Sequence, residues 1–437
     1  MPDSKPNGSA RQDAGRRIPG RPAQAASATQ IADPEYDTEA GEHKFAATQI
    51  VPDAARAAAG GVRVAPTPNW RLVKQSFAAA TSDGVAAAEH FYARLFAANP
   101  GIRALFPTSM VVQRPRMLAA LSRVIWSLDN EPECASLLRQ LGREHRRYGV
   151  LDKHCDAFFA ALRDTVQHDA GTPWTAETSA AWERAVDYLG AEMRAAIAAT
   201  DATPAWWIAE IVGHELRGPG VAVLRLRTDE PLPYQAGQYV PVQVARWSRT
   251  WRPYSVATAP RPGGPLELHV RAVPGGLVSN ALVHHSDVGE CVLLGAAEGT
   301  MTLADPGRDL LCIAGGTGLA PLKAIIEGVL RGGGPFWRRK ISLWFGARTE
   351  QDLYDLPDLR VLESICPGLK VIPVVSHQPE FVGMKGMLSD VTAQCANCED
   401  REVFISGPER MVRETARRLA SRVGADRIHH DPPDVSR

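Results

Sequence analysis

Apolar residues recur with helical spacing between Trp70 and about residue 200. Two stripes show this best: Met117, Leu121, Val124 and Leu128, and Leu137, Leu141, His145 and Tyr148. Residues three or four apart lie on one face of a helix, so each stripe marks a face that packs inward. Breakers at 99–101 (NPG) and 171–173 (GTP) separate the helical segments, with no convincing strand among them. The pattern predicts an all-α domain of about six or seven helices.

At about Pro204 the pattern changes to an alternation of apolar and polar residues. The alternation is clear in 222–227 (AVLRLR), 237–244 (GQYVPVQV) and 265–272 (PLELHVRA), and turns rich in glycine and proline lie between these segments. A period of two places every second side chain on one face of a strand. A small antiparallel β-barrel is therefore expected.

A third pattern begins at Asp309. Continuous apolar runs, LLCIA, ISLWFGA, LKVIPVV and EVFISGP, alternate with helical segments. Such alternation is typical of a mostly parallel α/β sheet. The chain is therefore predicted to be multidomain, with a tail over 1–65, a helical domain over 66–202, a barrel over 203–307 and an α/β domain over 308–437.

The first 65 residues show neither pattern. They contain only two aromatic residues and are rich in alanine, proline, glycine, aspartate and arginine, so they are predicted to be disordered, because they cannot bury enough apolar area to offset the entropy of ordering. The segments ATQIADPE (28–35) and ATQIVPD (47–53) resemble each other. They are interpreted either as low-complexity drift or as a short motif for a partner or for phosphorylation at Thr29 and Thr48.

Composition and charge exclude several classes of function. The chain has 437 residues, of which 49 are basic and 49 acidic, so no general attraction to nucleic acid or to an anionic membrane is expected. We find no apolar run of transmembrane length and no apolar core of a secretory signal. Seven scattered cysteines provide no disulfide framework, which fits a reducing compartment. The expected location is the cytoplasm.

Two glycine-containing turns in the last domain have the composition of phosphate-binding sites. The turn GGTGLAP (315–321) follows a predicted strand and precedes a predicted helix. Glycines let a phosphate approach the backbone, and a helix N-terminus supplies free N–H groups. A second turn, SGPERM (406–411), also ends a strand, so both turns could line one crevice. The alternative is that each is a simple left-handed turn.

The barrel contains a second group of residues suited to a cofactor. Arg252, Tyr254 and Ser255 lie in the segment RPYS, and they offer a charge for a phosphate, a flat ring for an aromatic cofactor and a hydroxyl for its edge. The segment GGLVSN (275–280) ends at an apparent helix start. Either segment alone could belong to an ordinary strand or turn.

The four segments together resemble the ferredoxin–NADP⁺ reductase superfamily, in the right order over about 225 residues. The resemblance implies FAD on the barrel, bound by Arg252, Tyr254 and Ser255, with the backbone at Gly276, Val278 and Ser279 near its pyrophosphate. It implies NADH or NADPH on the α/β domain, at Gly315, Gly316, Thr317, Gly318, Pro321, Arg348, Ser406, Gly407 and Pro408. Hydride would pass from nicotinamide to flavin. We favour NADH because no dedicated basic pair is evident for a 2′-phosphate.

The electron acceptor is not an iron–sulfur cluster bound within this chain. Such a cluster needs four closely spaced thiolates, and only Cys395 and Cys398 form a pair. The pair is interpreted as incidental thiols in a loop, with metal or disulfide chemistry as the alternative. The acceptor is therefore sought in the helical domain.

Five residues of the helical domain form a set that resembles a globin: Tyr92, Phe106, Gln113, Met117 and His145. A single histidine in an apolar stripe is more often a core residue than a ligand, so the set carries the resemblance. A globin followed by a reductase module is the flavohaemoglobin arrangement, which the chain resembles from about residue 68 to residue 431.

The resemblance implies that His145 binds the iron of haem b, that Tyr92 and Gln113 hydrogen-bond the dioxygen ligand, and that Phe106 and Met117 pack at the haem. It implies that electrons pass from NAD(P)H through FAD to haem, and that nitric oxide and O₂ are converted to nitrate. A phenol hydroxyl suits this chemistry because it donates to a partially negative oxygen.

Several positions depart from the family pattern. Where relatives buttress the proximal histidine with a tyrosine and a glutamate, this chain has Cys155 and Ile197, and Glu192 is more than a helical turn from the latter. Near the end of the chain, Pro433 stands where an aromatic residue would contact the flavin, and His430 is the nearest ring. Ser-Gly-Pro replaces the common Cys-Gly-Pro.

These departures resemble a divergent second subgroup of flavohaemoglobins and leave two alternatives to nitric oxide dioxygenation. The first is a flavin dehydrogenase or reductase with another substrate or acceptor. The second is a haem-based gas sensor whose N-terminal tail recruits a partner.

Overall fold

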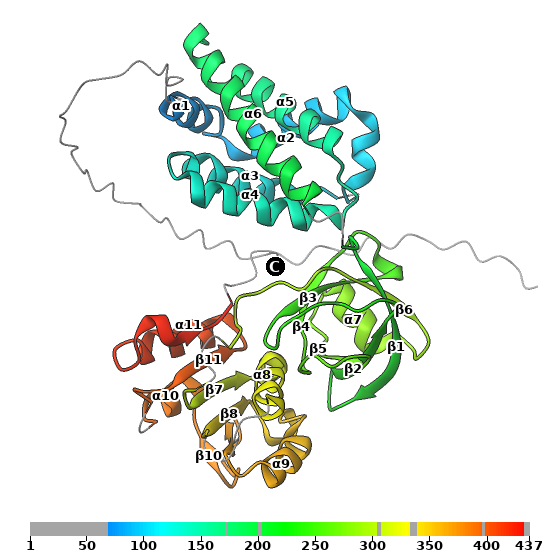
Figure 1. The fold of residues 1–437 in the computed structure, drawn as a ribbon, viewed down its shortest axis with the longest axis vertical. Coiled ribbons are helices and arrows are strands. Elements are labelled where there is room, and N and C mark those ends of the chain that lie inside the picture. The colour runs from blue at the N-terminus through cyan, green and yellow to red at the C-terminus, as the bar shows by residue number, and fades with distance from the viewer. Residues whose placement is uncertain are drawn as a thin grey trace, which may run out of the picture. The chain divides into compact units, whose positions relative to one another are not determined.

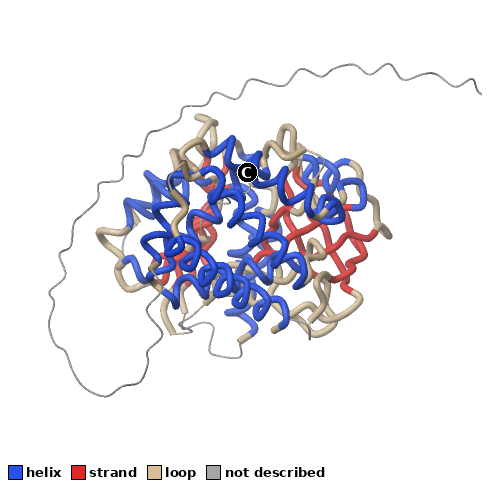
Figure 2. Tube along the Cα trace, turned by 90° about the horizontal axis from the view of Figure 1, so that it is seen from above, coloured by secondary structure: helices blue, strands red, loops and turns tan. Residues whose placement is uncertain are grey.

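The computed structural model describes residues 69–107, 109–171, 173–199, 203–303, 307–332, 339–395 and 398–431. The predicted disorder of residues 1–65 and the motif around Thr29 and Thr48 lie outside these residues, as does Pro433. Figure 1 shows the described part as a ribbon, and Figure 2 distinguishes its helices from its strands.

The first described part of the chain is helical, as the apolar stripes predict. Its elements are α1 (Trp70–Ala80), α2 (Gly84–Ala98), η1 (Pro100–Leu105), α3 (Gln113–Trp126), η2 (Ser127–Asp129), α4 (Glu131–Arg146), α5 (Asp152–Asp169) and α6 (Ala176–Ala198). Side chains at the helix starts satisfy free backbone donors: Asp83 accepts from the N–H groups of Val85 and Ala86 at α2. Trp182 is fully buried in the core, and its indole N–H donates to the Ser76 hydroxyl at 2.8 Å.

The second part is an antiparallel barrel of six strands. Its elements are β1 (Trp207–Leu216), β2 (Val221–Thr228), β3 (Tyr239–Val244), η3 (Ala245–Trp247), β4 (Arg252–Ser255), β5 (Leu266–Arg271), α7 (Leu277–His284) and β6 (Cys291–Leu294). The strand order is β4-β3-β6-β1-β2-β5, and a bridge between Val256 and Leu268 nearly closes the barrel. Helix α7 packs Val278 and Leu282 into the barrel core.

The third part is a parallel sheet covered by helices on both faces. Its strands are β7 (Leu310–Gly315), β8 (Ile341–Ala347), β9 (Leu369–Val375), β10 (Met384–Lys385), β11 (Glu402–Ser406) and β12 (Ile428–His429), in the order β10-β9-β8-β7-β11-β12. Its helices are η4 (Gly316–Gly318), α8 (Leu319–Arg331), η6 (Glu350–Asp352), α9 (Leu356–Ile365), α10 (Leu388–Ala393), α11 (Glu409–Leu419) and η7 (Ala425–Arg427). Helices α8 and α9 pack on one face, α10 and α11 on the other (Figure 1).

The fold class is confirmed, and some element boundaries differ from expectation. Helix α8 begins at Leu319, so Pro321 lies inside its first turn rather than at its start. Pro115 lies inside the first turn of α3, which begins at Gln113. Proline is tolerated at both places because first-turn N–H groups have no partner within the helix. Among the described residues, no helix combines the length and apolarity needed to span a bilayer.

Candidate functional site

The Tyr92 hydroxyl is a buried polar atom in the core of the helical part. Tyr92 lies on α2 and is 3% exposed, and among the described residues its hydroxyl has no partner at hydrogen-bonding geometry. Its ring contacts Phe96 and Phe106, with centroids 5.6 and 5.4 Å away. Burial raises the pKa of Tyr92 to about 12, although Gln113 and Arg114 act in the opposite direction. The phenol therefore remains protonated and can donate to a ligand.

The other predicted distal residues belong to the same region of the core. Phe106 directly follows η1 and packs at the edge of the helical core, and Met117 is buried in it. Gln113 is half-buried at the first position of α3, close enough to Tyr92 to lower the pKa of its hydroxyl. The structure thus brings Tyr92, Phe106 and Gln113 together, and Met117 belongs to the same apolar core.

His145 lies in the last turn of α4, on the face whose earlier members, Leu137 and Leu141, pack against the same core. Its Nδ1 donates to the carbonyl oxygen of Leu141 at 2.6 Å, and Nε2 hydrogen-bonds to no described residue. Burial lowers the pKa of His145, which favours the neutral ring that ligates metals. The orphaned Tyr92 hydroxyl and a neutral His145 with Nε2 available fit a haem site.

At the two positions where relatives carry a tyrosine and a glutamate, this chain has Cys155 and Ile197. Cys155 on α5 is buried, and burial raises the pKa of its thiol to about 11. Ile197 is buried on α6, and Glu192 contributes to raising the pKa values of Cys134 and Tyr188. Because Cys134 is near the start of α4 and His145 at its end, Glu192 lies far from the histidine. The described acceptor of Nδ1 is an uncharged backbone carbonyl.

The RPYS segment forms β4, the edge strand of the barrel sheet. Tyr254 pairs with Val240 and Ser255 with Tyr239 on β3, and Arg252, Tyr254 and Ser255 are all half-buried. One Nη of Arg252 donates to the carbonyl of Trp251 at 2.8 Å. Because these side chains are only half-buried, a flat cofactor can lie against them.

The glycine turn before α7 is held by its own side chains. Asn280 Nδ2 donates to the carbonyls of Val273 and Gly276 at 2.7 and 2.6 Å, and the Ser279 hydroxyl accepts from the Val273 N–H at 3.3 Å. Val278 is buried in the barrel core. The side chains of Ser279 and Val278 are therefore engaged internally, and the backbone N–H groups of the first turn remain for a phosphate.

The two turns of the α/β part meet at the carboxyl edge of its sheet. Strand β7 leads into Gly315, Gly316, Thr317 and Gly318, and the neighbouring β11 leads into Ser406, Gly407 and Pro408. A Cβ at Gly318 would lie 2.4 Å from the Ser406 carbonyl oxygen, and one at Gly407 would lie 3.0 Å from the Gly315 Cα. Gly316 has a φ of +55°. The expectation that both turns line one place is met because only glycine permits this approach.

Two other residues predicted to bind the nucleotide, Arg348 and Pro321, differ in their exposure. Arg348 follows β8 at the same edge and is exposed, and its carbonyl accepts from the His377 N–H at 2.8 Å. Pro321 is buried in the first turn of α8.

Sequence reasoning missed Arg271, at the end of β5. A Cβ built on Gly316 would lie 3.9 Å from an Nη of Arg271, so this guanidinium of the barrel stands at the nucleotide turn. The only sequence signal was its place shortly before GGLVSN, which does not indicate its direction.

The C-terminal segment contacts the barrel through Asp431. Its carboxylate accepts from the Thr300 N–H at 3.1 Å, and burial raises its pKa. His430, the ring nearest to the expected aromatic position, is exposed.

Comparison with known protein families agrees with the three parts of the fold. Residues 89–193 match the globin family, residues 209–302 the oxidoreductase FAD-binding domain, and residues 312–417 the oxidoreductase NAD-binding domain. A crystal structure of a flavohaemoglobin from Malassezia yamatoensis, with bound FAD and haem, superposes with a TM-score of 0.67 at 16% identity. The match covers 84% of this chain and 98% of that one. The chain has the flavohaemoglobin domain architecture.

Similarity at the level of sequence is found in reductases of other systems. The electron transfer component of a xylene/toluene monooxygenase from Pseudomonas putida is 32% identical over 216 residues, which are 47% of this chain and 60% of that protein. The ferredoxin–NAD(P)⁺ reductase component of naphthalene 1,2-dioxygenase/salicylate 5-hydroxylase systems from Ralstonia sp. is 36% identical over 213 residues, 48% of this chain and 63% of that protein. The chain thus spans about three-fifths of the length of these relatives.

The cofactors of this flavohaemoglobin-like fusion follow from its domains. The globin part implies haem, the FAD-binding part FAD and the NAD-binding part NAD(P)H. The chain therefore combines a globin with the FAD-binding and NAD-binding modules of an oxidoreductase.

A cluster elsewhere on the globin part has the residue types of a metal site. Asp169 accepts from Nδ1 of His90 at 2.8 Å and from Nδ1 of His168 at 2.7 Å. Arg94 Nε donates to Nε2 of His90 at 2.8 Å. Because arginine only donates, Nε2 accepts and the proton of a neutral His90 ring is on Nδ1. The nitrogen that faces Asp169 is thus protonated, and hydrogen bonds account for the cluster.

The CxxC pair shows no activated thiol. Burial raises the pKa of both Cys395 and Cys398. Since the thiolate is the reactive and ligating form, the environment favours the interpretation as incidental thiols.

Proposed function

We propose that this chain is a nitric oxide dioxygenase that uses NADH as its electron donor. One electron, O₂ and nitric oxide combine to give nitrate, with both oxygen atoms of O₂ retained in the product. Haem supplies the iron at which the two gases react, and FAD converts hydride into single electrons. His145 would hold the haem, and the β4 and α7 residues would hold FAD.

The buried Tyr92 hydroxyl is the observation that supports this proposal. A hydroxyl in an apolar site without a partner is unfavourable unless a ligand accepts its hydrogen bond. Because the pKa of Tyr92 is raised to about 12, its proton is retained at neutral pH and remains available to a negatively polarised oxygen. Phe96 and Phe106 surround the ring and limit water at this position, so the bond would act in a medium of low dielectric constant.

The hydrogen bond from the His145 ring to the Leu141 carbonyl favours a second function. Hydrogen bonding to a carbonyl donates less electron density through the ring than hydrogen bonding to a carboxylate. In addition, the named relatives are reductase and electron transfer components. The second candidate is therefore a reductase that passes electrons to a different acceptor, with little nitric oxide turnover.

The deciding experiment is aerobic nitric oxide consumption by the holoprotein, followed with a nitric oxide electrode in the presence of NADH. Rapid consumption that yields nitrate and is stopped by carbon monoxide is expected. Slow consumption, while NADH still reduces the flavin, would contradict the proposal and favour the second candidate.

Tyr92→Phe tests the residue that supports the proposal. Loss of the donor should slow nitric oxide consumption about tenfold or more and speed O₂ dissociation from the ferrous protein by a similar factor. Tyr188→Phe is the matched control, because the Tyr188 hydroxyl donates to the Glu131 carbonyl at 3.4 Å, far from this site. Equal O₂ dissociation in the two variants would exclude the proposed role of Tyr92.

His145→Ala tests the haem ligand separately. This variant should lose stoichiometric haem, seen as a missing Soret band, and should retain FAD. Full haem content would show that another residue ligates the iron.

A further inference from the structure

Charged side chains are buried where the barrel meets the α/β part. Lys323 on α8 is 9% exposed, and its ammonium lies 3.0 Å from a carboxylate oxygen of Glu267 on β5. The same ammonium lies 3.0 Å from Oδ2 of Asp355, which is fully buried just before α9. Lys323 therefore shares its charge between a barrel residue and a residue of its own domain.

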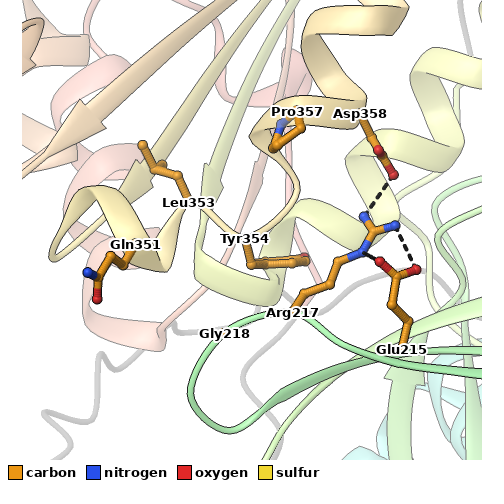
Figure 3. Close-up of a pocket in the computed structure, with 8 residues that line it drawn as sticks. All are labelled: Glu215, Arg217, Gly218, Gln351, Leu353, Tyr354, Pro357 and Asp358. Carbon is orange, nitrogen blue, oxygen red and sulfur yellow. Dashed lines mark hydrogen bonds and ion pairs between the residues drawn. The ribbon is translucent and has the colours of Figure 1, made fainter.

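A second cation crosses the same junction in the other direction. Arg217, in the turn between β1 and β2, forms ion pairs with Asp355 and, at 2.8 Å, with Asp358. Figure 3 shows this guanidinium between Glu215 on the barrel and Asp358 on α9. Asp355 thus receives Lys323 and Arg217 together, one from each domain.

A hydrogen-bond chain completes the network. His269 on β5 is buried and hydrogen-bonds through Nδ1 to the Tyr354 hydroxyl at 2.7 Å and through Nε2 to Glu267 at 3.1 Å. Tyr354 belongs to the α/β part, so this chain also joins the two domains. The members now defined, Arg217, Glu267, His269, Lys323, Tyr354 and Asp355, form what we call the junction network.

The junction network is better suited to fixing the relative position of the two domains than to adding stability. Buried ion pairs add little net stability because desolvation offsets their attraction, but they accept only a narrow range of arrangements. Domains within one chain move relative to each other unless their interface restrains them. A network of three cross-domain links is therefore suited to setting one relative position.

The junction network fixes the nucleotide site relative to the flavin site. Lys323 is one turn along α8 from the Gly316–Gly318 turn, and a helix transmits a fixed position along its length. Glu267 is on β5, which ends at Arg271 beside Gly316 and continues towards the turn that begins α7. Fixing Lys323 against Glu267 thus fixes the nucleotide turn against the flavin turn.

We propose that Lys323 is a positioning residue for hydride transfer, holding α8 against β5 so that nicotinamide meets flavin at reactive distance. The reaction breaks the nicotinamide C–H bond and moves its proton and two electrons to the flavin, while Lys323 neither gains nor loses a proton. This inference rests on FAD and NAD(P)H alone and is independent of nitric oxide.

The test is anaerobic stopped-flow reduction of the flavin in the full-length holoprotein. Lys323→Met should lower the rate at saturating NADH about tenfold or more, because a displacement of about 1 Å is costly to hydride transfer. FAD content and the half-saturating NADH concentration should change little. Lys323→Arg should recover much of the rate, and Lys370→Met, at an exposed lysine of the same domain, should match the wild type.

Electron transfer from flavin to haem provides an internal control. When the flavin is reduced by light, the nucleotide domain is bypassed, so Lys323→Met should transfer electrons to haem at the wild-type rate. A double variant with Glu267→Gln should be no slower than the slower single variant if both residues act through one contact.

Two results would overturn the proposal. One is an unchanged saturating rate in Lys323→Met, even if its melting temperature falls, since that would leave the lysine a purely structural role. The other is equal slowing of both electron transfer steps. If Lys323→Met does not fold, Asp358→Asn, at the half-exposed rim of the network, should slow flavin reduction about twofold to fivefold; an unchanged rate there would also overturn the proposal.

Discussion

Single atoms decide the chemistry available at each candidate site. The Tyr92 hydroxyl has no described partner, whereas His145 Nδ1 is held by the Leu141 carbonyl. The first arrangement favours binding of a polar ligand, and the second limits electron donation to it. At the nucleotide site the decisive feature is the missing side chain of Gly318.

Gly318→Ala is predicted to separate the two turns of the nucleotide site. Its Cβ would lie 2.4 Å from the Ser406 carbonyl oxygen and 2.5 Å from the Gly407 nitrogen, both backbone atoms. Forcing these apart should cost about 1–3 kcal/mol in unfolding free energy and weaken NADH binding. Calorimetric unfolding and NADH titration of flavin reduction measure the two effects.

Gly332→Ala provides the matched control. It ends α8 with a φ of −66°, and a Cβ there would make ordinary contacts at 3.5 Å. This variant should bind NADH as the wild type does. Equal behaviour of the two alanine variants would contradict the steric account.

At the scale of elements, strand β5 contributes alternate residues to the barrel core and to the junction network. Its inward-facing Leu268 and Val270 belong to the barrel core, while Glu267 and His269 face the junction network. Burial alone would raise the pKa of Glu267, but His269 and Lys323 lower it well below its usual value of 4.5. One strand thus supplies both the core and a charge that must stay ionised.

This pKa shift predicts acid sensitivity of the junction. A carboxyl whose pKa is lower in the folded than in the unfolded state stabilises the fold above the unfolded pKa, and this stabilisation is lost as pH falls. Stability should therefore decrease below a pH of about 4.5. Calorimetry across roughly pH 5 to 3 should show a smaller decrease in Glu267→Gln, whose stability at neutral pH is already reduced.

Glu380→Gln, at an exposed carboxylate, should reproduce the pH profile of the wild type. A Glu267→Gln profile as steep as that of the wild type would mean that other carboxylates determine the acid transition.

At the scale of the whole molecule, an ion pair between described residues links the globin part to the barrel. Arg147, two residues after His145, lies 2.5 Å from Glu298, and their side chains are 14% and 23% exposed. Glu298 is also paired through its backbone with Tyr239, whose neighbour across the sheet is Ser255. The haem-side helix and the flavin-side strand are therefore connected through few residues.

Arg147→Met is predicted to slow electron transfer from flavin to haem about threefold or more, because the pair restrains the separation of the two cofactors. Hydride transfer from NADH to flavin should not change, and stopped-flow spectra resolve both steps. Arg143→Met, at an exposed arginine of α4, is the control. Slower hydride transfer in Arg147→Met would refute the prediction that this ion pair affects only electron transfer to haem. The opposite pattern is expected for Lys323→Met, which should slow only hydride transfer.

Local pattern was sufficient for much of the fold. The stripe through Leu137 and Leu141 predicts α4 and its buried face, and the alternation in 265–272 predicts β5. The turns at Gly315 and Ser406 could be identified because glycine permits positive φ and proline fixes φ, and both effects are local. Boundaries were less accurate, as at α8, because capping depends on where neighbouring chain segments lie.

Long-range contacts were not predictable from local pattern. Lys323 and Glu267 are 56 residues apart, and a lysine and a glutamate at that separation carry no sign that they meet. Arg271 was missed for the same reason. The interaction depends on how the barrel docks on the α/β part, which no periodicity records.

The sequence by itself determined the three fold types, their order and the residue types at the cofactor sites, because helix and strand periods, turns and short motifs act between near neighbours. Only the tertiary structure decided that the two glycine turns touch, that the Tyr92 hydroxyl has no partner at hydrogen-bonding geometry among the described residues, and that Lys323 is shared between two carboxylates. Those properties arise from burial and from the direction of side chains, and both are fixed only when distant segments pack together.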